Sequence, residues 1–212
     1  MRAQVPTYRP TWVLIMASVM LLAGGYSLVA GLLKLRDPSI VLTVGNSDAA
    51  GSDTDVQLNR QLAAARAAAV APHRGTVRLE AVFEIVLALF TLYATAAVML
   101  RDPNGRALAL GVGALGIVYQ LGTLPVYVSL MRDYAELGAA PLAQMVMRSA
   151  AGSSTPDAAE VTSRLRSAIV GGPVVVTLIS VVGSLVLLAF FGGRRGKALY
   201  GINGPPSTRP GG

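Results

Sequence analysis

Four stretches of the chain are long, apolar and almost free of charged residues. They cover residues 10–33, 81–100, 107–131 and 167–193, and Glu84 is the one charged residue within them. About 20 apolar residues cross a bilayer as a helix. Nothing here alternates like a strand of a membrane barrel, and no stretch shows the polar stripe that a helix of a soluble bundle needs. The pattern predicts an all-α fold, an integral membrane four-helix bundle.

The polar segments between these stretches set the expected boundaries. Transmembrane helices are predicted over residues 11–33, 81–100, 107–131 and 168–193. Two long helical outer loops, 34–80 and 132–167, and a short cytoplasmic loop, 101–106, connect them. Residues 1–10 form the expected cytoplasmic N-terminus, and residues 194–212 a basic, disordered cytoplasmic tail. The first stretch exceeds the apolar core of a signal peptide, about 7–15 residues, so it is expected to stay as an anchor.

Lys and Arg residues are unevenly distributed among the polar segments. The two termini and the short loop hold eight of them against one acidic residue, whereas the two long loops hold ten against nine. Short segments rich in Lys and Arg stay in the cytoplasm. The net charge of +7 therefore indicates topology, with both termini cytoplasmic, and not a nucleic-acid partner. The Ala-, Gly- and Arg-rich composition favours a bacterial inner (cytoplasmic) membrane as the location of this multi-pass chain.

Both long loops show helical periodicity. In the first, a helix is predicted over about 55–70, with Leu58, Leu62, Ala65 and Ala69 on one face, and Pro72 is expected to end it. In the second, residues 141–150 place Leu142, Met145, Val146 and Ser149 on one face. These helices are expected to pack as an external cap, on each other or on a partner. The alternative is a pair of mobile loops.

A third loop helix is expected to start at Thr155-Pro156-Asp157, with Thr as its cap and Pro at its first position. It would continue into the fourth span, with an interruption at Gly171-Gly172-Pro173. Glycines within the spans, at Gly113 and Gly116 among others, permit close contact between helices.

Glu80 and Glu84 lie one turn apart at the outer end of the second span. An ionisable residue inside the hydrocarbon region is costly and faces a partner or water. The candidate ion-pair partners are Arg78, Arg36 and Arg132, all near the outer boundary. Two interpretations stay open: a structural ion pair at a helix start, and a carboxylate that handles a proton or a ligand.

Two further groups are candidate sites. Gln120 lies near the middle of the third span, where an amide hydrogen-bonds to another helix or lines a cavity for a quinone-type ligand. Arg194, Arg195 and Lys197 follow the fourth span, where they are expected to contact anionic lipid headgroups.

Two residue counts exclude several kinds of chemistry. The chain has no cysteine, so disulfides, thiolate metal sites and iron–sulfur clusters are absent. Its one histidine, His73, excludes multi-histidine metal centres and is expected on the surface of the first outer loop. No cofactor is expected. These exclusions favour a non-enzymatic protein. General acid–base catalysis by Glu84 alone stays possible, so the enzyme interpretation is left open.

The segment Leu35-Arg36-Asp37-Pro38 recurs as Leu100-Arg101-Asp102-Pro103, and we interpret both copies as helix stops. The first copy closes Ala30-Gly31-Leu32-Leu33-Lys34-Leu35-Arg36-Asp37-Pro38. This ending resembles that of the first helix in DoxX-like and MauE-like four-helix membrane proteins. Lys34, Arg36, Asp37, Glu80 and Glu84 match that layout. The resemblance implies a compact accessory protein of redox or quinone-linked membrane systems, but both outer loops are longer than in the family and the MauE-like cysteines are missing.

Three functions are compatible with the sequence. The first is an accessory or assembly subunit that engages a membrane-protein partner, or a second copy of itself, through the outer helices and the bundle surface. The second is a quinone- or small-molecule-binding protein, a redox subunit or transporter, that uses Glu84 and Gln120. The third is an envelope sensor whose outer loops bind the signal.

Overall fold

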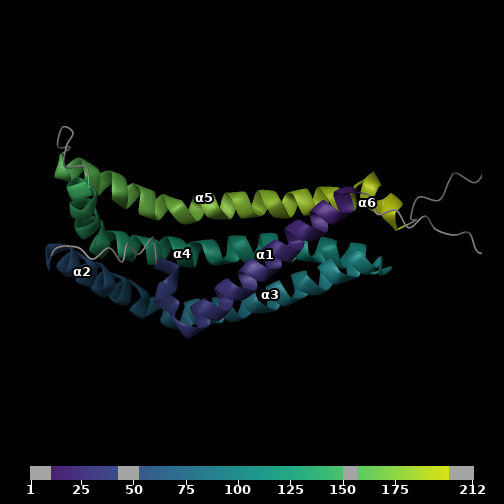
Figure 1. Cartoon of the computed structure of the whole chain (residues 1–212), viewed down its shortest axis with the longest axis horizontal. Helices are drawn as coiled ribbons and strands as arrows, with labels where there is room; N and C mark the ends of the chain where they lie inside the picture. Colours follow the sequence, from purple (N-terminus) through teal and green to yellow (C-terminus); the bar gives the residue numbers. More distant parts are fainter. Residues whose placement is uncertain (1–10, 43–52, 150–156, 201–212) are drawn as a thin grey trace, which may run out of the picture. The chain divides into compact units, whose positions relative to one another are not determined.

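The computed structural model describes residues 11–42, 53–149 and 157–200, and these residues are helical nearly throughout (Figure 1). The elements in chain order are α1 (Thr11–Arg36), η1 (Pro38–Leu42), α2 (Asp53–Val70), η2 (Ala71–His73), α3 (Arg74–Leu100), α4 (Gly105–Ser149), α5 (Ala158–Gly192) and α6 (Arg194–Leu199). No β-strand occurs among the described residues. The prediction of an all-α fold is confirmed.

Four helical stretches are long and apolar enough to cross a membrane. They are Thr11–Arg36, Thr54–Leu100, Gly105–Arg148 and Ala158–Gly192, and each contains one of the four predicted spans. Their large side chains are extensively exposed; Leu22 on α1, for example, keeps 73% of its surface accessible. Apolar surface of this extent is a liability in water and suits a hydrocarbon solvent. The coarse prediction of a multi-pass helical membrane protein is therefore supported.

The predicted loops are more helical than expected. α2, η2 and α3 follow one another without a gap, so Pro72 falls within a 3-10 turn where its missing N–H is tolerated. α4 continues through Pro141 to the end of the predicted cap helix. α5 passes Gly171-Gly172-Pro173 without the interruption that the sequence predicted. Prolines within membrane helices are tolerated because neighbouring groups satisfy the freed carbonyls.

Both Asp-Pro segments end a helix as predicted, and they do so with the same hydrogen bond. After α1, the Ser39 amide donates to Asp37 Oδ1 at 2.9 Å. After α3, the Asn104 amide donates to Asp102 Oδ1 at 2.7 Å. Arg101 adopts a left-handed φ of 56°, and the Asp102 amide reaches back to the Ala97 carbonyl at 2.9 Å, which is the Schellman closure of a helix. The two turns lead into η1 and α4, respectively.

The described residues divide into two compact units. Unit 1 contains residues 11–29, 84–118 and 180–200, and unit 2 contains residues 30–42, 53–83, 119–149 and 157–179. The core of unit 1 consists of Val13, Met20, Ala94, Val98, Ala109, Val112 and Phe191. Within this unit Trp12 packs edge-on against Phe190 with ring centroids 4.7 Å apart, and Arg106 Nε donates to the Phe191 carbonyl at 2.8 Å.

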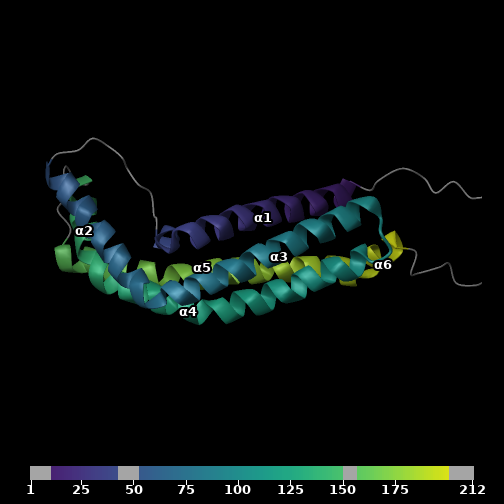
Figure 2. The same cartoon turned by 90° about the horizontal axis from the view of Figure 1, so that it is seen from below.

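Unit 2 contains α2 and the C-terminal part of α4, the helices predicted to lie outside the membrane. Its core consists of Leu42, Ala65, Ala69, Val70, Val77, Leu130 and Tyr134. The predicted apolar face of α2 is buried throughout, from Leu58 to Ala69, and α2 lies beside the C-terminal part of α4 (Figure 2). Arg148 contacts Asp55 at 3.5 Å across the same two helices. The expectation that the loop helices pack on each other is thus correct for α2.

Two predictions about the cap and the tail need correction. In the C-terminal part of α4, Val146 is exposed, and the buried positions are Tyr134, Ala135, Gly138, Ala139, Pro141 and Ala143. The buried face therefore follows the small residues of this helix. Residues 194–199 form α6 and are not disordered. Asp157 caps α5 through the Ala159 amide at 3.0 Å, whereas the predicted segments 1–10, 155–156 and 201–212 lie outside the described residues.

Candidate functional site

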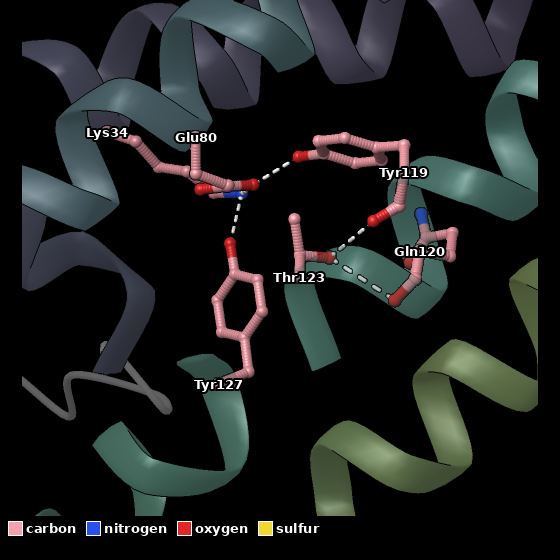
Figure 3. Close-up of polar contacts among 6 residues, drawn as sticks. All are labelled: Lys34, Glu80, Tyr119, Gln120, Thr123 and Tyr127. Carbon is pink, nitrogen blue, oxygen red and sulfur yellow. Dashed lines mark hydrogen bonds and ion pairs between the residues drawn. The ribbon is translucent and has the colours of Figure 1, made fainter. Parts of the chain in front are cut away.

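Three polar residues recur at every fourth position of α4, at Tyr119, Thr123 and Tyr127. Residues at this spacing share one helix face. The Thr123 hydroxyl donates to its own helix, to the Tyr119 carbonyl at 3.0 Å and to the Gln120 carbonyl at 3.3 Å. It therefore stays on α4, and the two tyrosine hydroxyls are left to face neighbouring helices (Figure 3).

Lys34 of α1, Glu80 of α3, and Tyr119 and Tyr127 of α4 form one hydrogen-bonded cluster within unit 2, which we call the polar centre (Figure 3). Lys34 Nζ lies 3.2 Å from Glu80 Oε1 and 2.8 Å from the Tyr127 hydroxyl oxygen. The Tyr119 hydroxyl also donates to Glu80 Oε1. One carboxylate, one ammonium and two phenols from three helices thus meet at one place.

The polar centre is largely removed from solvent. The side chain of Glu80 is 6% exposed and that of Lys34 is 16% exposed. Removing either charge from water costs several kcal/mol by order of magnitude, and their attraction offsets this cost only with further hydrogen bonds. Tyr119 supplies such a bond to Glu80 Oε1, and the Tyr127 hydroxyl accepts one from Lys34 Nζ. Glu80 Oε2, also buried, has no hydrogen-bond partner among the described residues.

The three arginines predicted as ion-pair partners of Glu84, at the outer end of the second span, lie elsewhere. Arg36 and Arg78 are exposed, and Arg132 pairs with Glu136 on its own helix at 3.7 Å. Lys34, and not an arginine, pairs with Glu80. A lysine has a compact ammonium on a flexible stem, which can reach a buried carboxylate between helices with less bulk than a guanidinium.

The other two predicted polar residues are Glu84 and Gln120. Glu84 is buried at 8% exposure and belongs to unit 1, whereas Glu80 belongs to unit 2. Gln120 is half-buried, and its side-chain amide bonds to none of the residues that the structure describes. The predicted role of Gln120 as an interhelical hydrogen-bonding residue is therefore not supported, and its neighbour Tyr119 makes the contact to another helix.

The basic residues after the fourth span belong to α6. Arg194 is exposed and Lys197 is half-buried, and Arg195 lies between them on the same short helix.

Tyr200 follows α6 directly. Burial raises the pKa of its phenol, and the negative charge of Asp102 raises this pKa further. Across the described residues, no group of three or more His, Asp or Glu side chains is placed to hold a metal ion.

The chemistry available at the polar centre is hydrogen bonding and proton sharing. Lys34 and Glu80 balance each other in charge, and the phenols can both donate and accept. Such a cluster suits recognition of a small polar head group, or the passage of a proton between adjacent oxygens.

Sequence reasoning missed Lys34, Tyr119 and Tyr127 as members of one site. The signal was present as the four-residue spacing of Tyr119, Thr123 and Tyr127, a short polar stripe inside an otherwise apolar span. The sequence singled out Lys34 only through the predicted resemblance to DoxX-like proteins. Nothing in its spacing from Glu80 shows that α1 and α3 bring the two together.

Comparisons with family models, with curated proteins and with solved structures give no match to this chain. The resemblance to DoxX-like and MauE-like proteins therefore stays a prediction from the sequence.

Proposed function

We propose that this chain is a multi-pass membrane protein that binds a small molecule with a quinone- or phenol-type head group at the polar centre. The observation that carries the proposal is the buried Lys34–Glu80 pair, completed by tyrosines from a third helix. An ion pair in apolar helices adds little stability compared with packed apolar residues of the same volume. A role in recognising a ligand gives a reason for placing charges there.

The proposal includes a location. By the predicted boundaries, Glu80 lies just outside the second span and Tyr127 near the outer end of the third. A ligand held there would keep its head group at the interface and its apolar part in the hydrocarbon region. The proposed membrane is the bacterial inner membrane, with both termini in the cytoplasm, as the distribution of Lys and Arg favours.

Topology can be tested directly because the chain has no cysteine. We expect an exposed cysteine on α2, in the variant Q61C, to react with an impermeant maleimide in intact spheroplasts. The variant N104C, in the α3–α4 turn, should react only after permeabilisation. Labelling of N104C in intact spheroplasts would contradict the proposed orientation.

Ligand binding can be tested by thermal unfolding of the purified full chain in detergent. Short-chain benzoquinones and alkylphenols serve as probes, and binding stabilises the folded state by mass action. The variants Y119F and Y127F should reduce the probe-induced shift in melting temperature. The matched control is Q120L, next to Tyr119, which should leave the shift unchanged. Equal shifts in all four proteins, or none in any, would contradict the proposal.

The accessory-subunit function remains the second candidate. It is favoured by the folded cap of unit 2, on which Val56 of α2 and Leu137 of α4 are exposed apolar side chains outside the predicted spans. Purification of the tagged chain in mild detergent should then recover a defined membrane-protein partner or a second copy. Recovery as a lone monomer from several gentle detergents, with V56S and L137S behaving like the wild type, would count against it.

A further inference from the structure

The two carboxylate oxygens of Glu80 differ in their hydrogen bonding. Oε1 accepts from Lys34 at 3.2 Å and from the Tyr119 hydroxyl. Oε2 is equally buried and has no hydrogen-bond partner within the described part of the chain. A buried acceptor without a partner loses its hydration, and the loss is greater when the group is charged. The polar centre therefore holds one acceptor that a bound molecule would satisfy.

The donors of the polar centre are engaged. The Lys34 ammonium donates to Glu80 and to Tyr127, and the Tyr119 hydroxyl donates to Glu80. The Tyr127 hydroxyl accepts from Lys34 and is itself hydrogen-bonded to Glu80, yet Oε2 has no partner among the described residues. A carbonyl or ether ligand, which only accepts hydrogen bonds, would have to break one of these contacts. A hydroxyl ligand can donate to Oε2 and break none.

Charge narrows the ligand class further. A cationic ammonium would lie close to the Lys34 ammonium, and an anionic carboxylate would lie close to Glu80, so either would meet a like charge. A neutral head group meets neither penalty. Exposed apolar side chains are neighbours in sequence of the two charged residues, Leu33 beside Lys34 and Leu79 beside Glu80, and they suit the hydrocarbon part of an amphiphile.

We infer that the polar centre selects neutral amphiphiles whose head group donates a hydrogen bond, such as an alkylphenol or a quinol, over analogues that only accept one. This inference rests on the proposed function and specifies its ligand. For a quinone pair, it means that the reduced form binds more tightly than the oxidised form.

The test compares 4-heptylphenol with its methyl ether, which differ in the hydroxyl donor and are both stable to air. Affinity for the full chain in lipid nanodiscs is measured by thermal shift and by calorimetry, with empty nanodiscs to correct for partitioning. We expect the phenol to bind about tenfold more tightly, as befits one hydrogen bond to a charged acceptor. The variant E80Q should reduce the preference to about twofold or less, on the same principle.

The matched control is E136Q, which makes the same chemical change at an exposed glutamate of unit 2 and should keep the full preference. If E80Q does not fold, the wild type and E136Q are compared by infrared difference spectroscopy. The phenol should then perturb the carboxylate stretching region in both proteins, and the ether in neither.

The outcomes separate the inference from the proposed function. Equal affinity for phenol and ether, or tighter binding of the ether, overturns the inference and leaves a ligand site at the polar centre. Binding of neither probe overturns the proposed function for this ligand class and the inference with it. If E80Q still prefers the phenol, Glu80 is not the acceptor of the ligand hydroxyl, and the inference is overturned at that point. With E80Q unfolded, an identical infrared response to both probes overturns it as well.

Discussion

Nε2 of His73 lies 2.8 Å from Oδ2 of Asp133, which joins η2, the link between α2 and α3, to α4. The histidine side chain is 19% exposed and the aspartate 40%. The sequence predicted a histidine on the surface of the first outer loop, and the structure places it, partly exposed, in the 3-10 turn between α2 and α3. The contact holds the cap helix α2 where it enters α3.

We expect H73A and D133A to destabilise the fold by about 1 kcal/mol each, since both groups are partly hydrated. The double variant should cost less than the sum, because the two changes remove the same contact. Chemical unfolding in a fixed detergent would measure the three differences. The pair Arg132–Glu136, exposed on one helix, is the control, with a coupling of about 0.5 kcal/mol or less. Strictly additive effects at His73 and Asp133 would show that the contact adds no stability.

Removing one charge of the polar centre should destabilise the protein more than removing both. The variant K34M leaves the Glu80 carboxylate buried without its ammonium, and we expect a cost of roughly 2 kcal/mol, below that of a fully buried pair because Lys34 keeps some hydration. In the double variant K34M/E80Q, the amide is neutral and still accepts from Tyr119, so much of this loss should return. Thermal unfolding of the three proteins decides the point. A double variant less stable than K34M would contradict the balance of charges described here.

The glycines of α4 that face α5 should not tolerate a methyl group. A Cβ on Gly113 would lie 2.9 Å from Leu188 Cγ and 3.2 Å from the Ser184 carbonyl oxygen. We expect G113A to cost about 1–3 kcal/mol through overpacking, and L188A to reduce that cost in the double variant. The control is G183A on α5, where a Cβ meets nothing within 4 Å, and helix propensity should make it neutral or stabilising by up to about 1 kcal/mol. If G113A matched G183A in unfolding free energy, the close approach of α4 and α5 would be in error.

Protonation of Asp37 in acid should lower the stability of the folded protein slightly. Its pKa is lowered chiefly by the hydrogen bond from the Ser39 hydroxyl, at 2.6 Å, and next by the Ser39 amide. A folded pKa below the unfolded value means that this stabilisation is present above the unfolded pKa. It is lost as the pH falls through the folded pKa.

The variant S39A removes the hydroxyl and should move the pKa of Asp37 up toward its usual value, as measured by carboxyl NMR of aspartate-labelled protein. S129A, at an exposed serine of α4, should leave that titration unchanged. An Asp37 titration unaffected by S39A would assign the lowered pKa to the backbone amide instead.

The sequence was sufficient for features that depend on local periodicity. Charge-free stretches located the four helices that are long and apolar enough to cross a membrane. The spacing from Leu58 to Ala69 predicted the buried face of α2, and the repeated Asp-Pro located two helix stops. These features follow from side-chain transfer energies and backbone geometry within a few residues.

The sequence was insufficient where two helices meet. Lys34 and Glu80 are 46 residues apart, and no local pattern says which face of α1 turns toward α3. Arginines were predicted as partners because they lie near the outer boundary, but their side chains are exposed. The continuity of α4 through Pro141 was missed for a related reason. A proline's cost depends on whether packing against other elements satisfies the carbonyl that it frees.

The hydroxyl of Tyr127 in the polar centre and the carboxylate of Asp133 in the cap contact are carried by the same helix, six residues or about 9 Å apart along its axis. A ligand that moves the Tyr127 side chain would therefore act on the part of α4 that also carries the contact of Asp133 with His73. If loss of the His73–Asp133 contact changes the affinity for a ligand by some factor, that ligand must change the strength of the contact by the same factor. With such a coupling, the junction at the start of α3 would report thermodynamically on a ligand bound at the polar centre.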